Sequence, residues 1–392
     1  MTPVLVLGNG ITALGVLRIL GRSGIPAYIH GYGNGIERRS RWFRPMPLSR
    51  PMDDPSANLG SVLSACRLPV AVLMPCSDYW AMQIARMPEE LRRHYPASIA
   101  SAEAMRTLVD KAPFSTLLAE TGVPHPMTRL LQGPADLEAV PDDVLDGAFL
   151  KPHDSQAFFA RFGVKAFLIR SRKEGVERLD QIERAGFAVL LQQYIPGPGS
   201  LHYFVDGFFD ASGRLRAAFT RRRLRMSPPD FGNSSYMVSV PREEVQQAIE
   251  SVKLALSRIG FRGIFSAEFK KDPRDGVFKL LEVNARPWWY VEFAARCGVD
   301  VCTMAYRDAL GEPVADVVSH REGARMVYPY YDFFACRDAW RADEMSLLQW
   351  ASSWAGAQQP LFNWTDPLPA LAEAWRVGRQ FAGTRWKRVA HA

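Results

Sequence analysis

Three polar side chains alternate along one short stretch of the sequence. The run FKLLEVNARPW places Glu282, Asn284 and Arg286 at every second position. Side chains on a β-strand alternate between its two faces, so these three would project to the same side. Two oxygen ligands and a cation in a row are the groups that Mg²⁺ ions and a triphosphate require. The stretch therefore predicts a metal and phosphate site on a strand.

A further oxygen ligand is expected on the preceding strand. Glu268 lies in a second segment of strand composition, and the turn sequence DPRDG separates the two segments. If Lys271 pairs with Val277, Glu268 lies opposite Leu280 and diagonal to Glu282. Diagonal neighbours are about 7–8 Å apart, a span that two carboxylates can bridge through a metal. An ordinary hairpin with a surface glutamate and a structural asparagine is the alternative.

These residues resemble the ATP-grasp superfamily, and within it the carboxylate–amine ligases that include D-aspartate-ligase-like enzymes. The likeness runs from about residue 1 to residue 311. It implies that Glu268, Glu282 and Asn284 bind two Mg²⁺ ions, for which Mn²⁺ could substitute. It also implies that Arg286 is a catalytic residue that contacts phosphate or the reacting carboxylate.

The resemblance extends to lysines that would bind the phosphates of ATP. The segments VDKAPF and GVPHP resemble the opening of the ATP-grasp module, which assigns Lys111 to the phosphates. Lys151 ends an apolar strand, where an ammonium group would act as a point charge on phosphate oxygens. Lys165 resembles a further lysine of these ligases. Residues 152–165 have Gly163 as their only glycine, so we expect a lid that is shorter or differently built than a glycine-rich one.

The hinge that would hold adenine follows an apolar strand predicted over residues 188–194. This strand leads into IPGPG and is similar to the family's hinge. The resemblance implies that backbone groups around Gln193, Tyr194 and Ile195 bind the adenine edge, in an apolar pocket with few polar contacts.

An arginine-rich strand is predicted over residues 214–225, with Arg221, Arg223 and Arg225 on one face. Together with the following MSPPDFGNSS it resembles a family segment. This implies a catalytic role for Arg223 at the γ-phosphate or acyl phosphate, and for Arg225 at a substrate carboxylate. A solvated basic edge strand is the alternative. Trp288 would line the substrate pocket or pack in the core.

The chain opens with a β-α-β pattern, which predicts a parallel, doubly wound sheet. The turn GNGITA has dinucleotide-binding spacing, but the first acid beyond the second strand is Glu37, which lies too late to hold a ribose. A tight turn that needs glycine is therefore favoured. A later strand ends at PCSD, where Asp78 would contact substrate, or where Asp78 or Ser77 would cap the next helix.

The expected fold class is α/β, with three parts. A Rossmann-like parallel-sheet domain would occupy residues 1–108, and an α+β ATP-grasp module residues 109–311. The module would divide into a first half with the nucleotide lid (109–196) and a metal- and substrate-binding half (197–311). A mostly helical extension (312–392) would cover the cleft or form a homodimer interface.

Composition narrows the class of protein. The 392 residues are 47% hydrophobic and 23% charged, as in a soluble globular protein, and no apolar run is long enough to span a membrane. The five cysteines are scattered, which favours reduced thiols over zinc sites or disulfides.

The opening lacks a basic leader and a cleavage site, so the cytoplasm is expected. The net charge of +7 is modest and its basic clusters are dispersed, so nucleotide and a small anionic substrate are favoured over nucleic acid, and no membrane partner is expected.

These features together predict an ATP-dependent ligase. It would activate a small-molecule carboxylate as an acyl phosphate and join it to an amine, with release of ADP and phosphate. One alternative is an ATP-grasp enzyme with another acceptor, such as bicarbonate in a carboxylase. Others are a nucleotide-binding protein without turnover and an NAD-binding protein.

Overall fold

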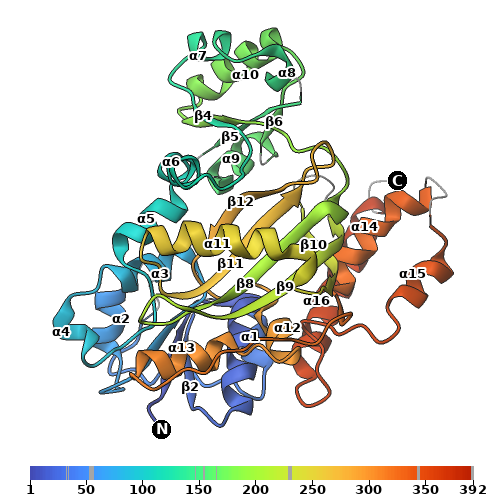
Figure 1. The fold of residues 1–392 in the computed structure, drawn as a ribbon. Coiled ribbons are helices and arrows are strands. Elements are labelled where there is room, and N and C mark those ends of the chain that lie inside the picture. The colour runs from blue at the N-terminus through green and yellow to red at the C-terminus, as the bar shows by residue number, and fades with distance from the viewer. Residues whose placement is uncertain are drawn as a thin grey trace.

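The structure is a computed structural model in which a small upper lobe stands on a larger body (Figure 1). It describes residues 1–31, 33, 35–52, 57–145, 147–152, 155–164, 166–227, 232–341 and 345–389. The predicted α/β class is confirmed, because a parallel N-terminal sheet precedes two antiparallel sheets and a helical C-terminal region. The predicted domain limits at residues 108 and 311 stay predictions.

The N-terminal sheet has three parallel strands in the order β2-β1-β3. Every residue of β1 is buried, as expected for a parallel strand covered on both faces. The strands are Val4–Leu7 (β1), Ala27–His30 (β2) and Val72–Pro75 (β3). The surrounding helices are Gly10–Arg22 (α1), Ile36–Arg39 (η1), Leu59–Ala65 (α2), Asp78–Ala85 (α3), Glu89–Arg92 (α4) and Ala102–Val109 (α5).

The glycine turn before α1 holds one of the protein's own carboxylates. Gly8 and Gly10 have φ angles of 128° and 76°, which favour glycine. The buried Glu37 accepts a hydrogen bond of 2.9 Å from the backbone N–H of Gly10. Its carboxylate therefore lies at the N-terminus of α1, where the pyrophosphate of a dinucleotide would bind. This arrangement supports a structural role for the turn.

The upper lobe contains an antiparallel sheet in the order β4-β7-β5-β6. It has its own apolar core, which includes Leu137, Leu150, Phe158 and Leu191. The strands are Thr128–Leu130 (β4), Phe149–Pro152 (β5), Phe167–Leu168 (β6) and Val189–Gln192 (β7), and the helices are Ala135–Glu138 (α7), Asp142–Leu145 (α8), Ser155–Phe162 (α9) and Arg172–Arg184 (α10). The helix Lys111–Thr121 (α6) precedes the lobe and packs in the body's core through Phe114 and Leu118. The helix α9 follows β5, where a glycine-rich lid would be, so this lid is differently built.

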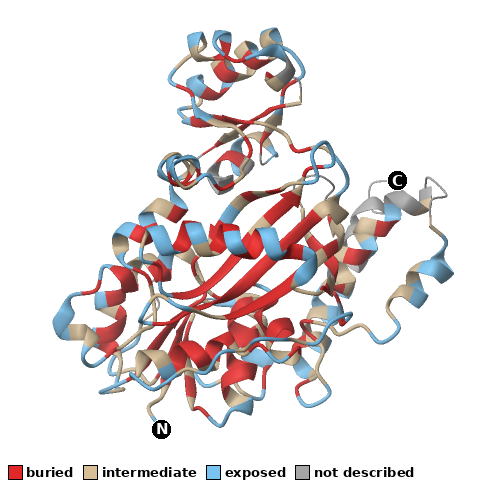
Figure 2. Ribbon diagram, viewed as in Figure 1, coloured by how far each residue is buried: buried red, intermediate tan, exposed pale blue. Residues whose placement is uncertain are grey.

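The body contains an antiparallel sheet in the order β12-β11-β8-β9-β10-β13. Figure 2 shows burial along most of its length, because α11 covers one face and α1, α12 and α13 cover the other. The strands are His202–Phe209 (β8), Leu215–Ser227 (β9), Asn233–Ser239 (β10), Gly263–Lys271 (β11), Phe278–Asn284 (β12) and Arg325–Val327 (β13). The helices are Gly199–Leu201 (η2), Glu243–Val245 (η3), Gln246–Arg258 (α11), Val291–Arg296 (α12) and Val301–Ala309 (α13).

The register of β11 against β12 differs from the predicted one. Lys271 pairs with Phe278, and Glu268 lies directly opposite Glu282 instead of opposite Leu280. The predicted register is wrong because the turn is one residue longer than assumed, and because a bulge leaves Leu281 without an opposite residue. The observed register makes Glu268 and Glu282 direct cross-strand neighbours instead of diagonal ones.

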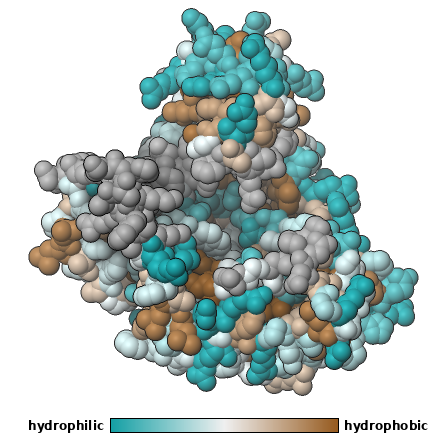
Figure 3. All heavy atoms as spheres, turned by 180° about the vertical axis from the view of Figure 1, so that it is seen from behind, coloured by the Kyte–Doolittle hydropathy of each residue, from teal (hydrophilic) through white to brown (hydrophobic). Residues whose placement is uncertain are grey.

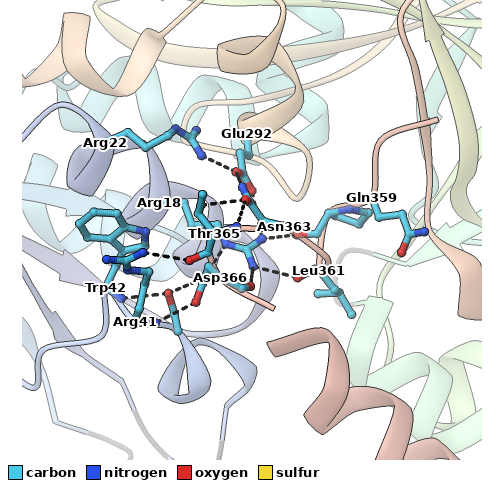
Figure 4. Close-up of polar contacts among 12 residues, drawn as sticks. Arg18, Arg22, Arg41, Trp42, Glu292, Gln359, Leu361, Asn363, Thr365 and Asp366 are labelled. Carbon is cyan, nitrogen blue, oxygen red and sulfur yellow. Dashed lines mark hydrogen bonds and ion pairs between the residues drawn. The ribbon is translucent and has the colours of Figure 1, made fainter. Parts of the chain in front are cut away.

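The C-terminal region is mostly helical, as predicted, with α14 (Pro329–Arg341), α15 (Leu347–Ser353) and α16 (Leu368–Val389). The strand β13 was not predicted, and it extends the body's sheet at β10. A buried arginine of α1, Arg18, joins this region to the body through ion pairs with Asp366 and Glu292 (Figure 4). Among the helices described, none is both long and apolar enough to cross a bilayer.

Candidate active site

A cavity lies between the upper lobe and β12, the edge strand of the body's sheet. Five predicted site residues line it: Asp78, Lys111, Lys151, Glu282 and Asn284. Seen from behind, the surface is hollowed between the lobe and the body, and hydrophilic residues line the hollow (Figure 3). The fold thus gathers oxygen ligands and cations that lie far apart in the sequence.

The two lysines approach the cavity from the lobe side. Lys111 is the first residue of α6, whose N-cap is Asp110, and Lys151 lies on β5. The Nζ atom of Lys111 donates to the carbonyl of Pro152 at 3.3 Å. Burial and the nearby Lys151 lower the pKa of Lys111 to about 8, although Glu282 and Asp110 act in the opposite direction. Among the described residues, neither ammonium group has a carboxylate at ion-pair distance.

The three predicted metal ligands lie on the facing strands β11 and β12. Glu268 and Glu282 are directly opposite each other, and Asn284 Nδ2 donates to Glu282 Oε1 at 3.2 Å. Two carboxylates and an amide offer oxygen ligands alone, which suits Mg²⁺. The described residues contain no cluster of three His, Cys, Asp or Glu side chains that could hold a metal. The set therefore depends on the asparagine amide.

Glu268 is held in its ionised form by two donors. Its Oε1 atom lies 2.7 Å from His202 Nδ1 and 3.0 Å from Arg223 Nη2. Burial raises the pKa of Glu268, but Arg223 and His202 outweigh burial and the net pKa is lowered. Burial lowers the pKa of His202, whereas its contact with Glu268 raises it, and the net pKa is lowered. Sequence reasoning missed His202, although the register of β8 against β11 could have revealed it.

Arg286 forms a bidentate ion pair with Asp78. Its Nε and Nη2 atoms lie 2.8 and 3.0 Å from the two carboxylate oxygens, and Nη2 also donates to Asn284 Oδ1 at 3.0 Å. Ser77 caps α3 by accepting a hydrogen bond from Trp80 N. The Asp78 carboxylate therefore does not serve as the cap, and it faces the predicted catalytic arginine.

Arg225 is paired with a carboxylate from the C-terminal region. Its Nε and Nη2 atoms lie 2.8 and 2.7 Å from the oxygens of the buried Asp332. Asp332 also accepts hydrogen bonds from Ser235, Trp350 and Trp354. Where the sequence predicted a substrate carboxylate on Arg225, the structure has a carboxylate of the protein itself. Sequence reasoning missed Asp332, since no motif surrounds it.

The predicted adenine hinge directly follows a cavity residue. Gln192 lines the cavity, and the backbone N–H of Gln193 donates to the carbonyl of Met127 at 2.8 Å. Tyr194 is partly buried and Ile195 is buried. The hinge thus adjoins the cavity without being part of its lining.

The remaining two predictions concern Trp288 and Lys165. Trp288 is 5% exposed and belongs to the core cluster beneath the sheet, so core packing describes its position. Its neighbour Trp289 is 37% exposed and packs against Tyr331 of α14. Lys165 lies outside the described residues.

Comparison with known proteins finds a family model and a curated relative that match part of the chain. A family model described as ATP-grasp in the biosynthetic pathway with Ter operon matches residues 187–329. The D-aspartate ligase of Enterococcus faecium (strain Aus0004) is 25% identical over 223 residues, which are 55% of this chain and 53% of that enzyme. The chain is thus matched to about half the length of this relative.

Solved structures share the fold at low sequence identity. L-amino acid ligase from Bacillus licheniformis is 17% identical, with a TM-score of 0.59 over 80% of this chain and 75% of that one. N5-carboxyaminoimidazole ribonucleotide synthetase from Thermus thermophilus is 16% identical, with a TM-score of 0.64 over 83% and 82%. Biotin carboxylase from Campylobacter jejuni is 17% identical, with a TM-score of 0.63 over 82% and 74%. The chain is thus similar to the ATP-grasp family model over residues 187–329, and it shares its fold with these solved ligases and carboxylases.

Proposed function

We propose that the protein is an ATP-dependent carboxylate–amine ligase. The observation that carries the proposal is the cavity, in which Lys111 and Lys151 face the edge strand that bears Glu282 and Asn284. Lys111 and Lys151 have no carboxylate at ion-pair distance among the described residues, and the charge of one disfavours the charge of the other, so an anionic ligand explains them better than stability does. The similarity to a D-aspartate ligase favours amide-bond formation among ATP-grasp reactions.

The nucleotide would bind between the lobe and the body. Lys111 and Lys151 would contact its phosphates, and the backbone of residues 193–195 would hold the adenine edge, with Lys165 as a further contact. Glu268, Glu282 and Asn284 would hold two Mg²⁺ ions, which when bound neutralise charge on the β- and γ-phosphate oxygens. Their oxygen-only chemistry and the facing positions of the two carboxylates fit such ions.

The arginines would act on the substrate side. Transfer of the γ-phosphoryl group to a carboxylate oxygen releases ADP and gives an acyl phosphate, which is a good electrophile. The amine nitrogen then attacks the acyl carbon, phosphate leaves, and the nitrogen loses a proton. Arg286 and Arg223 would stabilise the charge that develops on oxygen in these steps. Asp78 would orient Arg286, and Arg225 would act on the substrate only if its pair with Asp332 opens.

A carboxylase is the second candidate. The structural neighbours include biotin carboxylases, and their TM-scores are as high as that of the amino acid ligase. At such low identity these neighbours inform on the fold alone, so the acceptor has to be found by experiment.

Release of ADP tests both candidates. The protein is mixed with ATP and Mg²⁺ and a panel of amino acids and other carboxylates, with and without amines, or with bicarbonate. We expect ADP release that requires both an acid and an amine, together with an amide product detected by mass spectrometry. ADP release driven by bicarbonate would favour the carboxylase, and binding of ATP without any turnover would contradict both candidates.

A further inference from the structure

The outer face of α16 and the segment before it expose large apolar side chains. Trp364 is 88% exposed, Trp375 is 70%, Leu371 is 60% and Leu368 is 56%. Single exposed apolar residues are ordinary, but a group that includes two tryptophans marks an interaction surface.

Helical geometry brings three of these residues into one stripe. Leu368, Leu371 and Trp375 follow the spacing i, i+3, i+7, so they share one face of α16. The opposite face is the packed one, because Ala370 contacts an apolar cluster that includes Leu361. The stripe therefore points away from the body.

The segment that carries Trp364 is firmly anchored. Arg18, which is fully buried, donates to Asp366 Oδ2 and to the carbonyl of Leu361, each at 2.8 Å. Ser40 Oγ and Arg41 N also donate to the Asp366 carboxylate, at 2.7 and 2.8 Å (Figure 4). The backbone segment that carries Trp364 is thus held in place by these hydrogen bonds.

The exposed charges around this stripe are all positive. The helix α16 packs against η1, so residues 36–41 and 360–379 form one surface. The acids of these two segments add no free negative charge to the surface, since Glu37 and Asp366 are buried and Glu373 is paired with Arg376. Arg376 is neutralised by this pair, so the exposed charged side chains left in the two segments are Arg38, Arg39, Arg41 and Arg379.

We propose that this surface binds the anionic face of a lipid bilayer. We call it the C-terminal patch, and it consists of Trp364, Leu368, Leu371 and Trp375 with the four arginines Arg38, Arg39, Arg41 and Arg379. Tryptophan and leucine side chains would enter the headgroup region, while the arginines pair with lipid phosphates, as in interfacial amphipathic helices. This departs from the sequence-based expectation of no membrane partner.

Charge also argues against a second copy of the chain as the occupant. In a two-fold dimer the same patch meets itself, so the four arginines of one protomer would approach those of the other. The patch offers no exposed carboxylate to balance them. An anionic surface provides the complementary charge.

Vesicle flotation tests the proposal. The full chain is mixed with vesicles of phosphatidylcholine alone, or of phosphatidylcholine with phosphatidylglycerol, and the protein that floats with the lipid is measured. We expect on the order of ten-fold more bound protein with the anionic vesicles, and loss of this binding at high salt. Trp364→Ser and Trp375→Ser should each reduce binding, and Arg379→Gln should reduce it about five-fold.

Two control variants and three alternative outcomes complete the test. Leu254→Ser and Arg258→Gln change exposed residues of α11 and should leave vesicle binding unchanged, because α11 lies outside the patch. Absence of flotation with anionic vesicles would overturn the proposal, as would equal binding to both vesicle types. Failure to float, combined with a dimer in light scattering that Trp375→Ser dissociates, would assign the patch to a second copy. Binding to DNA without binding to vesicles would also overturn it.

Discussion

The lobe side of the cavity and the strand β9 of the body, which does not line the cavity, differ in how their positive charges are paired. On the lobe side, Lys111 and Lys151 lie near each other, and no carboxylate among the described residues is at ion-pair distance from either. On the body side, the arginines of β9 that share one face are all paired. Their partners are Asp206 for Arg221, Glu268 for Arg223 and Asp332 for Arg225.

This difference distinguishes cations that are available to bind a ligand from cations that stabilise the fold. A paired, buried arginine gives a strand a fixed position, and removing its partner leaves an uncompensated charge. Among the described residues, Lys111 and Lys151 have no carboxylate at ion-pair distance, and burial together with the repulsion from Lys151 lowers the pKa of Lys111 despite Glu282 and Asp110. We infer that the lobe side is organised for an anion that arrives with the substrate, whereas most of the arginine strand is organised for the structure.

The largest effect is expected at the strand that faces the lysines. Glu282→Gln should lower turnover about 10³-fold or more, because the carboxylate that would hold metal at the transferring phosphate is lost. Glu282 is exposed, so the free energy of unfolding should change by no more than about 0.5 kcal/mol. ADP release and chemical denaturation measure the two quantities. Glu250→Gln on α11 serves as a control, and near-normal turnover in Glu282→Gln would remove Glu282 from the site.

The next largest effect is expected on the stability of the fold, at the ion pair between Arg225 of β9 and Asp332. Asp332→Ala should lower the free energy of unfolding by about 3 kcal/mol, because Arg225 and the indole N–H groups of Trp350 and Trp354 lose their shared acceptor. Asp316→Ala removes a half-exposed partner of Arg216 and should cost less than about 1 kcal/mol. Denaturant titration compares the two variants. If Asp332→Ala kept its stability but lost turnover, Arg225 would belong with the binding charges.

The parts of the site that sequence could predict are those fixed by short-range pattern. The alternation of Glu282, Asn284 and Arg286 is local, because strand periodicity alone sets which side chains share a face. Lys111 and Lys151 stand next to recognisable segments, and the cavity does bring both of them to the metal strand. The fold class followed from the same local patterns.

The parts that sequence missed depend on long-range packing. A one-residue bulge sets the register of Glu268, and nothing in the turn DPRDG specifies it. The pairing of Arg225 with Asp332 joins residues that are distant in the chain, and β13 adds to the sheet from a region expected to be helical. The role of Glu37 at the glycine turn likewise requires the folded position of η1.

A smaller effect is expected when one of the unpaired lysines is removed. Lys151→Met should raise the KM for ATP by about 10–100-fold, the usual value of a hydrogen bond to a charged group. The free energy of unfolding should stay constant or rise slightly, since the variant removes repulsion with Lys111. Steady-state kinetics and denaturation test both expectations. Lys173→Met on the exposed surface of α10 is the matched control, and a clear loss of stability in Lys151→Met would make that lysine structural.

The smallest effect is a dependence on pH that only the lysine side should show. The pKa of Lys111 is lowered from 10.5 to about 8, so above pH 8 the folded protein loses a proton that the unfolded chain keeps. Stability contributed by this group therefore rises with pH between 8 and 10.5, whereas binding of ATP phosphates should weaken over the same range. We expect the KM for ATP to increase by at most about ten-fold between pH 7 and pH 9. Lys111→Arg keeps its charge and should flatten this profile; an unchanged profile in that variant would mean that another group titrates.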